Sequence, residues 1–243
     1  MNSEKREAFF EHVRALRKVL VVSVIAVLVL FVLFFYLLCD PLVNFVLAPV
    51  RSRGIDIIAT AVSEALMIQL KVCLVAAVVA GMPVIIHQIW SFIAPALYPH
   101  EKRLFAGLFF VALLLFCAGV AFCYLYVFPL AINLFWAASD TVAPAMWSVN
   151  EYFSFVLSFV LPFGLMFELP VVVVMLAKRG KVSYAGLAKA RKYVLLVIVV
   201  VAAILTPPDV ISQCMLAAPM YLLYEIAAQL ARFVKPRATE EEA

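Results

Sequence analysis

The chain has 243 residues, of which 67% are hydrophobic and only 14% are charged, and its mean hydropathy is +1.10. Soluble domains carry about 25% charged residues, and a soluble protein of 27.0 kDa has too much surface to hide so many apolar side chains. Composition therefore excludes an ordinary cytosolic enzyme, a disordered regulator and a nucleic-acid-binding protein. It indicates an integral membrane protein.

Six apolar runs are candidates for membrane-spanning helices, since about 20 apolar residues cross the hydrocarbon core. They cover residues 19–39, 65–86, 104–128, 152–177, 193–205 and 210–231. The fifth run reaches only about 20 Å as a helix, which is too short to cross alone. The whole chain, residues 1–243, is thus predicted to be a single all-α membrane domain with six transmembrane helices, the last two short.

A short polar segment, Thr206-Pro207-Pro208-Asp209, joins the fifth and sixth runs. Two consecutive prolines cannot continue a helix, and they hold the residue before them in an extended conformation. We therefore expect a tight hairpin between these two spans, on the outer side of the membrane.

The basic residues predict the orientation in the membrane. Of the lysines and arginines, only Arg51, Arg53 and Lys71 lie outside the N-terminal segment, the loops after the second and fourth runs, and the C-terminal tail. Because cytoplasmic loops carry the excess of Lys and Arg, both termini are predicted to be cytoplasmic. The basic residues thus follow membrane topology and do not indicate a nucleic-acid partner. Residues 1–18 then form a cytoplasmic amphipathic segment, and residues 232–243 form a cytoplasmic tail.

Motifs for catalysis or metal binding are missing from the sequence. It contains no HExxH, GxSxG, P-loop or GxGxxG pattern, so no catalytic residue, cofactor or metal site is predicted. The five cysteines all lie in or beside apolar runs, which favours buried thiols over a disulfide framework.

Three polar residues of the predicted spans are candidates for function: Glu168, Gln213 and Glu225. A carboxyl group as deep in a span as Glu168 costs a few kcal/mol and usually faces a cavity, a partner or a pathway. Glu225 lies nearer the cytoplasmic end of its span, where its side chain can reach the membrane surface. Glu168 leaves a proton- or ion-coupled secondary transporter or channel open as an alternative, although no internal repeat supports one.

The cytoplasmic loop after the second span is rich in aromatic residues and ends in Tyr98-Pro99-His100-Glu101-Lys102-Arg103. One interpretation of Glu101 is a local ion pair with its basic neighbours, which contributes little. The other is an acid displayed at the membrane surface that captures a basic ligand.

Several motifs, in order along nearly the whole chain, resemble the TatC family, the polytopic subunit of the twin-arginine protein translocase. They are His12 with Leu16-Arg17, the Gln-x-Trp-x-Phe-x-x-Pro-x-Leu-Tyr-x-x-Glu pattern ending at Glu101, Phe167-Glu168-x-Pro170, the segment from Thr206 to Gln213, and Tyr224-Glu225. One position departs from the family: the acid usual in the N-terminal segment is replaced by Ala15. Glu11 lies one helical turn earlier and is the expected substitute.

The resemblance implies a receptor and scaffold without enzymatic activity, in the bacterial cytoplasmic (inner) membrane. Its implied partners are twin-arginine signal peptides of folded precursor proteins, single-span subunits of the TatA and TatB type, the lipid bilayer and further copies of itself, and transport would draw on the proton-motive force. The implied signal-peptide-binding residues are Glu101, Glu11, Arg17, Tyr98, Lys102 and Arg103. The expected partner-docking residues are Leu205, Thr206, Pro207, Pro208, Asp209 and Gln213.

Overall fold

The computed structural model describes residues 3–93, 102–139, 146–206 and 210–234. The chain divides into two compact units. The first comprises Met1–Ala48 and Ala59–Leu113, and the second comprises Pro49–Ile58 and Leu114–Ala243. Nearly every described residue is helical, and the strands β1 (Asp56–Ile58) and β2 (Met146–Ser148) have three residues each.

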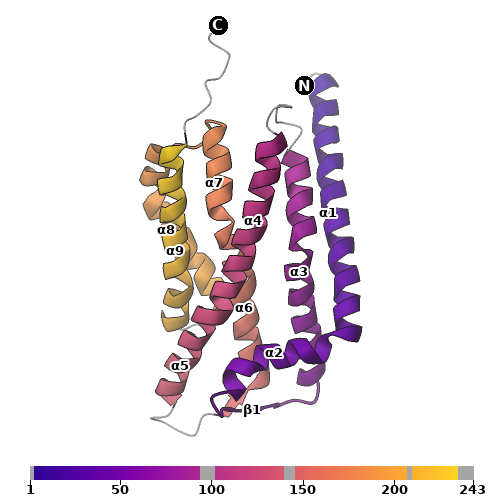
Figure 1. The fold of residues 1–243 in the computed structure, drawn as a ribbon, viewed down its shortest axis with the longest axis vertical. Coiled ribbons are helices and arrows are strands. Elements are labelled where there is room, and N and C mark those ends of the chain that lie inside the picture. Colours follow the sequence, from indigo (N-terminus) through magenta and orange to yellow (C-terminus); the bar gives the residue numbers. More distant parts are fainter. Residues whose placement is uncertain (1–2, 94–101, 140–145, 207–209, 235–243) are drawn as a thin grey trace. The chain divides into compact units, whose positions relative to one another are not determined.

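The first unit is built on two long helices that lie side by side, α1 (Ser3–Leu37) and α3 (Glu64–Ile93) (Figure 1). The run from Val19 has neither Gly nor Pro, so nothing interrupts its backbone hydrogen bonds, and α1 joins the amphipathic segment and the first predicted span in one helix. Gly81 of α3 lets the two helices approach closely, because a Cβ there would lie 3.3 Å from the side chain of Val27. A third helix, α2 (Cys39–Arg51), follows α1.

The third predicted span changes its winding along its length. It begins as α4 (Lys102–Phe122), continues as the π-helical segment η3 (Cys123–Val127) and ends as α5 (Phe128–Ser139). Pro129 explains the change, since it has no N–H and its ring crowds the carbonyl four residues earlier. The N–H of Phe128 donates instead to the carbonyl of Cys123, five residues back, as in a π-helix. The helical run thus continues beyond the predicted boundary at residue 128.

Close packing in the second unit depends on two glycines, one on α4 and one on α6 (Val149–Phe167). A Cβ on Gly119 would lie 2.8 Å from the carbonyl oxygen of Phe163, and a Cβ on Gly164 would lie 2.5 Å from the ring of Phe116. The helix α7 (Leu169–Lys178) follows α6 directly. The two glycines therefore let α4 and α6 pack closely, as small residues do in other membrane proteins.

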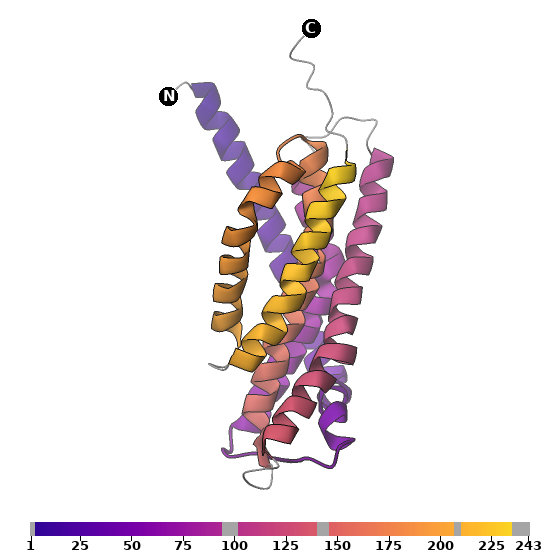
Figure 2. The same ribbon diagram turned by 90° about the vertical axis from the view of Figure 1, so that its left-hand side faces the viewer.

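The last two helices, α8 (Tyr184–Leu205) and α9 (Val210–Phe233), run antiparallel beside each other (Figure 2). The hydroxyl of Ser183 accepts a hydrogen bond of 3.2 Å from the N–H of Gly186 and caps α8. The helix therefore begins nine residues before the apolar run predicted at 193–205. On its other side α9 packs against α7, where Val173 and Ala177 meet Ala227 and Ala231.

Two loops of the second unit are joined by the parallel pairing of β1 and β2, with Ile57 opposite Trp147. Beside the strands, Nε of Arg53 donates to Oδ1 of Asn133 at 3.0 Å, and Nη1 of Arg53 donates to the carbonyl of Pro49. The strand pairing and the hydrogen bond between Arg53 and Asn133 tie segments that are far apart in the sequence.

Within the described residues, five helical runs are long and apolar enough to cross a membrane: Val13–Leu37, Glu64–Ile89, Gly107–Ala137, Val149–Lys178 and Val210–Phe233. Helix α8 is not among them, because its first half carries Lys189, Arg191 and Lys192. Its apolar half coincides with the short fifth run. The prediction of an all-α integral membrane protein is confirmed, whereas the individual span boundaries stay predictions.

Candidate functional site

The residues assigned to signal-peptide binding lie in parts of the chain that the structure describes incompletely. Tyr98 and Glu101 lie outside the described residues. Glu11 is a helical position of α1, and Lys102 and Arg103 are the first residues of α4. The side chain of Arg17 is exposed on α1. This site therefore stays a prediction from the sequence.

Glu168 lies at the junction between α6 and α7, and Pro170 explains why the helix is interrupted there. Without an N–H, Pro170 cannot bond the carbonyl four residues earlier. The N–H of Glu168 donates to the carbonyl of Leu165, only three residues back, at 3.1 Å. The N–H groups of Val171 and Val172 then share the carbonyl of Glu168. Pro170 thus places Glu168 where the helical hydrogen bonding of a membrane-spanning run is interrupted.

One oxygen of the Glu168 carboxyl group has no hydrogen-bond partner in the described part of the chain. This oxygen, Oε1, is buried. A buried polar atom without a partner is costly, especially in a membrane. The preceding residue, Phe167, packs on the ring of Phe122 and against Gly119, so aromatic side chains fix the junction. The role of Glu168 in binding a partner stays a prediction from the sequence.

The expected partner-docking residues lie around the turn of the α8–α9 hairpin. Thr206 is buried, and its hydroxyl donates to the carbonyl of Ala202 at 2.9 Å. Gln213 donates through Nε2 to the carbonyl of Val199 across the hairpin at 3.1 Å. Leu205 is partly buried at the end of α8, and Pro207, Pro208 and Asp209 lie outside the described residues. Gln213 thus joins the two helices, whereas the hydroxyl of Thr206 closes the last turn of α8.

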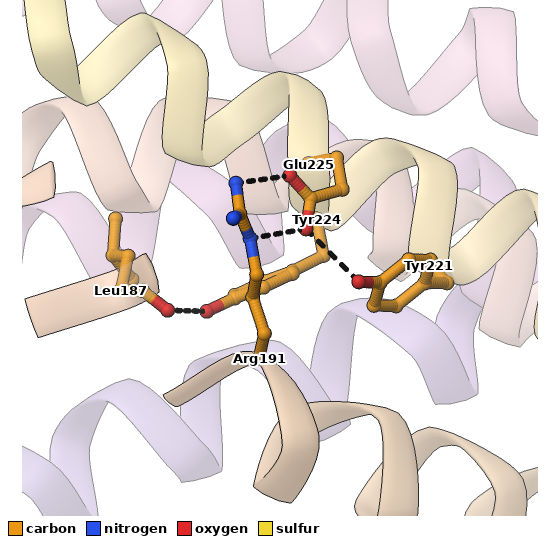
Figure 3. Close-up of polar contacts among 5 residues, drawn as sticks. All are labelled: Leu187, Arg191, Tyr221, Tyr224 and Glu225. Atoms are coloured by element: carbon orange, nitrogen blue, oxygen red, sulfur yellow. Dashed lines mark hydrogen bonds and ion pairs between the residues drawn. The ribbon is translucent and has the colours of Figure 1, made fainter. Parts of the chain in front are cut away.

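A polar cluster joins the opposite ends of the same two helices (Figure 3). Nη2 of Arg191 donates to Oε2 of Glu225 at 2.8 Å, and Nε of Arg191 lies 2.7 Å from Oε1. The hydroxyl of Tyr221 donates to the same carboxylate at 3.0 Å. The hydroxyl of Tyr224 donates to the carbonyl of Leu187 at 2.7 Å. Glu225, interpreted from the sequence as an acid that reaches the surface, has an internal partner instead.

Arg191 keeps its charge in this cluster. Its hydrogen bond to Glu225, followed by that to Tyr184, raises the pKa of Arg191 above its ordinary value. Both members of the pair are partly exposed, with 37% of the Arg191 side chain and 25% of the Glu225 side chain accessible. Water therefore weakens the ion pair, which positions the helices more than it stabilises them.

Sequence reasoning did not identify Arg191, Tyr221 or Tyr224 as contact residues. A signal was present, however: Arg191 lies 16 residues before Pro207, and Glu225 lies 17 residues after Pro208. Positions at equal distance from the turn of a helical hairpin lie at the same level. Among the described residues no group of three or more His, Cys, Asp or Glu side chains could hold a metal ion.

Comparison with known proteins gives the same family throughout. The family model described as "Sec-independent protein translocase protein (TatC)" matches residues 11–219. The TatC protein of Carboxydothermus hydrogenoformans is 41% identical over 235 residues, which are 96% of this chain and 96% of that protein. The TatC protein of Escherichia coli K12 is 39% identical over 245 residues and covers 100% of this chain and 95% of its own length. A crystal structure of the twin-arginine translocase receptor TatC is similar with a TM-score of 0.86 at 37% identity, over 92% of this chain and 99% of that one.

Proposed function

The chain belongs to the TatC family of Sec-independent protein translocase proteins, and we propose that it is the subunit that binds twin-arginine signal peptides of folded precursor proteins. The observation that carries this is the likeness to a twin-arginine translocase receptor in both sequence and fold, over nearly the full length of both chains. The chain is thus a multi-pass membrane subunit of a protein translocase. The alternative of an ion or small-molecule transporter finds no support among these relatives.

For recognition of the arginine pair, we assign the carboxylates of Glu101 and Glu11. A guanidinium group is bound best by a carboxylate that accepts two parallel hydrogen bonds, and such a bond is stronger where water is partly excluded. In this chain Ala15 stands where the family usually has an acid, and we assign its role to Glu11. The two positions lie one turn apart on nearly the same face of α1. Four further residues are assigned to the same site: Arg17, Tyr98, Lys102 and Arg103.

For the single-span partners of the TatA and TatB type, we assign the outer half of the α8–α9 hairpin. Helix α8 packs mainly on α9, and it exposes Leu196, Val200 and Ile204 at intervals of four residues. These side chains form one apolar stripe along the helix. Because the apolar part of α8 is short, a partner helix or a thinned bilayer must meet its end. Glu168 offers a polar contact to such a partner.

The remaining assignments rest on the orientation predicted from the basic residues and on what the family implies. Both termini are cytoplasmic, the membrane is the bacterial inner membrane, and the chain works as several copies in a complex driven by the proton-motive force. The basic loops after the second and fourth spans support this orientation.

Binding of a fluorescent signal peptide to the full-length chain in lipid nanodiscs tests the proposal. A peptide with the arginine pair should bind at least ten-fold more tightly than the same peptide with two lysines, since lysine cannot form the paired contact. Glu101→Gln should remove most of this preference. Glu151→Gln changes an exposed acid at the start of α6 and is the matched control. Equal affinity for both peptides would contradict the receptor function.

The same binding assay tests the assignment of Glu11 with two further variants. Glu11→Ala should weaken binding, and adding Ala15→Glu to that variant should restore it, because the carboxylate returns to the same face one turn away. If the double variant binds no better than Glu11→Ala, Glu11 is an ordinary solvated charge.

A further inference from the structure

The ends of three helices of the second unit meet in one place. Val173 and Ala177 of α7 pack against Ala227 and Ala231 of α9, and Leu187 of α8 packs against the same core. The end of α7, the start of α8 and the end of α9 therefore lie side by side, at one end of the second unit (Figure 1). The side chains that point outward from the three helices gather at this end.

Most of the charged side chains there are basic. Residues 178–192, from the last residue of α7 into α8, hold six basic residues and no acidic residue. One of the six, Arg191, is paired with Glu225. Arg232 adds a further charge from the last turn of α9. The basic patch thus consists of Lys178, Arg179, Lys181, Lys189, Lys192 and Arg232, and all but the first two are exposed.

Two tyrosines indicate the level of the basic patch in the membrane. The guanidinium carbon of Arg232 lies 5.9 Å from the ring centre of Tyr184, and Nζ of Lys192 lies 5.0 Å from the ring centre of Tyr193. Tyr193 begins the apolar run at 193–205, and tyrosine is enriched at the level of the lipid headgroups. The patch therefore lies where the apolar part of α8 ends, which is the level of the lipid phosphates.

The charge of this segment is more one-sided than orientation in the membrane requires. Residues 1–18, which are assigned to the same side, mix five basic with three acidic residues. A block of lysine and arginine immediately beside a membrane-spanning helix is typical of segments that bind anionic lipids. A twin-arginine peptide is itself cationic and does not complement such a surface.

We propose that the basic patch binds the phosphate groups of anionic phospholipids and so holds the joined ends of α7, α8 and α9 at the membrane surface. The arginines donate paired hydrogen bonds to phosphate oxygens, and the lysines act as point charges. Lipid binding here needs only that the second unit lies in a membrane, so it is independent of the proposed receptor function.

Photo-crosslinking in vesicles tests lipid binding. The full-length chain is placed in phosphatidylcholine vesicles with a photoreactive group beside the headgroup of either phosphatidylglycerol or phosphatidylcholine, and labelled peptides are identified by mass spectrometry. We expect peptides from residues 178–193 to be labelled about ten-fold more by the anionic lipid, because several cations face it. Lys181→Gln with Lys192→Gln should remove most of this preference. Lys181→Arg with Lys192→Arg keeps both charges and should retain it.

Lys18→Gln removes an exposed basic charge from α1 and is the matched control, which should leave the labelling of residues 178–193 unchanged. Equal labelling by the two lipids, or equal preference in the glutamine and arginine variants, would contradict the proposal. Inorganic phosphate at the same concentration should not compete, and if it abolishes the labelling, the patch binds a free anion instead. A preference that appears only after Glu240, Glu241 and Glu242 are replaced by glutamine would assign the patch to the acidic end of the tail.

Discussion

Glu168 owes its position to a proline two residues further on. Pro170 leaves the helix without one hydrogen bond, the turn tightens at Glu168, and Oε1 of the carboxyl group is buried without a partner among the described residues. A membrane-spanning acid in such a place marks a functional contact more often than a structural one. At this scale the sequence alone selects Glu168 as a candidate, because the cost of a carboxyl group depends on its depth in the membrane, and the functional role of Glu168 stays a prediction.

Three substitutions at Glu168 test what the carboxyl group does. A neutral acid donates a hydrogen bond to a partner, and an amide does so as well, so Glu168→Gln should keep substantial export. Glu168→Ala and Glu168→Leu remove the donor and should lower export at least ten-fold while signal-peptide binding is unchanged. Export assays on the three variants, with peptide binding as the control, distinguish them. If Gln is as damaging as Leu, an ionised or proton-exchanging group is required.

At the scale of elements, the crossing of α4 and α6 depends on the absence of a side chain at Gly119. A methyl group there would lie 2.8 Å from a backbone oxygen, which cannot move aside without bending α6. Gly119→Ala should therefore destabilise the protein by about 1–3 kcal/mol. Thermal unfolding in detergent measures the change. Gly107→Ala is the matched control on the same helix, where nothing lies within 4 Å, and an equal loss in both variants would contradict this explanation.

The polar cluster of the α8–α9 hairpin is the second element-scale feature. Arg191→Gln and Glu225→Gln should each lower the midpoint of thermal unfolding by about 2–4 °C, since a partly exposed ion pair contributes about 1 kcal/mol at most. The exchanged pair, Arg191→Glu with Glu225→Arg, should recover part of the loss. Lys189→Gln removes an exposed charge two residues before Arg191 and should have no effect. Additive losses in the exchanged variant would show that the two side chains do not interact.

Docking of a single-span partner on the same hairpin is tested by disulfide crosslinking. Cysteines introduced at Leu205 or Ile204, near the end of the short apolar part of α8, should crosslink to a cysteine in a TatA- or TatB-type helix. Ala202 is buried against the hairpin interior, so Ala202→Cys is the control that should not crosslink. Crosslinks confined to the first and third spans would place the docking site elsewhere.

At the scale of the whole molecule, the apolar runs predicted most of the helical architecture. The helices extend beyond the predicted spans where charged residues continue the helix outside the apolar run, as at Tyr184–Lys192 of α8. The pairing of β1 with β2 could not be predicted, because strands of three residues carry no periodic pattern. The Arg191–Glu225 pair joins residues 34 positions apart, and only the geometry of the hairpin brings them together.

The central claim is that this chain receives twin-arginine signal peptides on its cytoplasmic surface, and photo-crosslinking tests it most directly. A photoreactive residue is placed at Leu97 or His100, beside Glu101, in the full-length chain in inverted membrane vesicles. We predict a crosslink to a precursor with an intact arginine pair and a loss of at least ten-fold when both arginines are replaced by lysine. Equal crosslinking of both precursors, or none from either position while the protein is inserted and abundant, would contradict the claim.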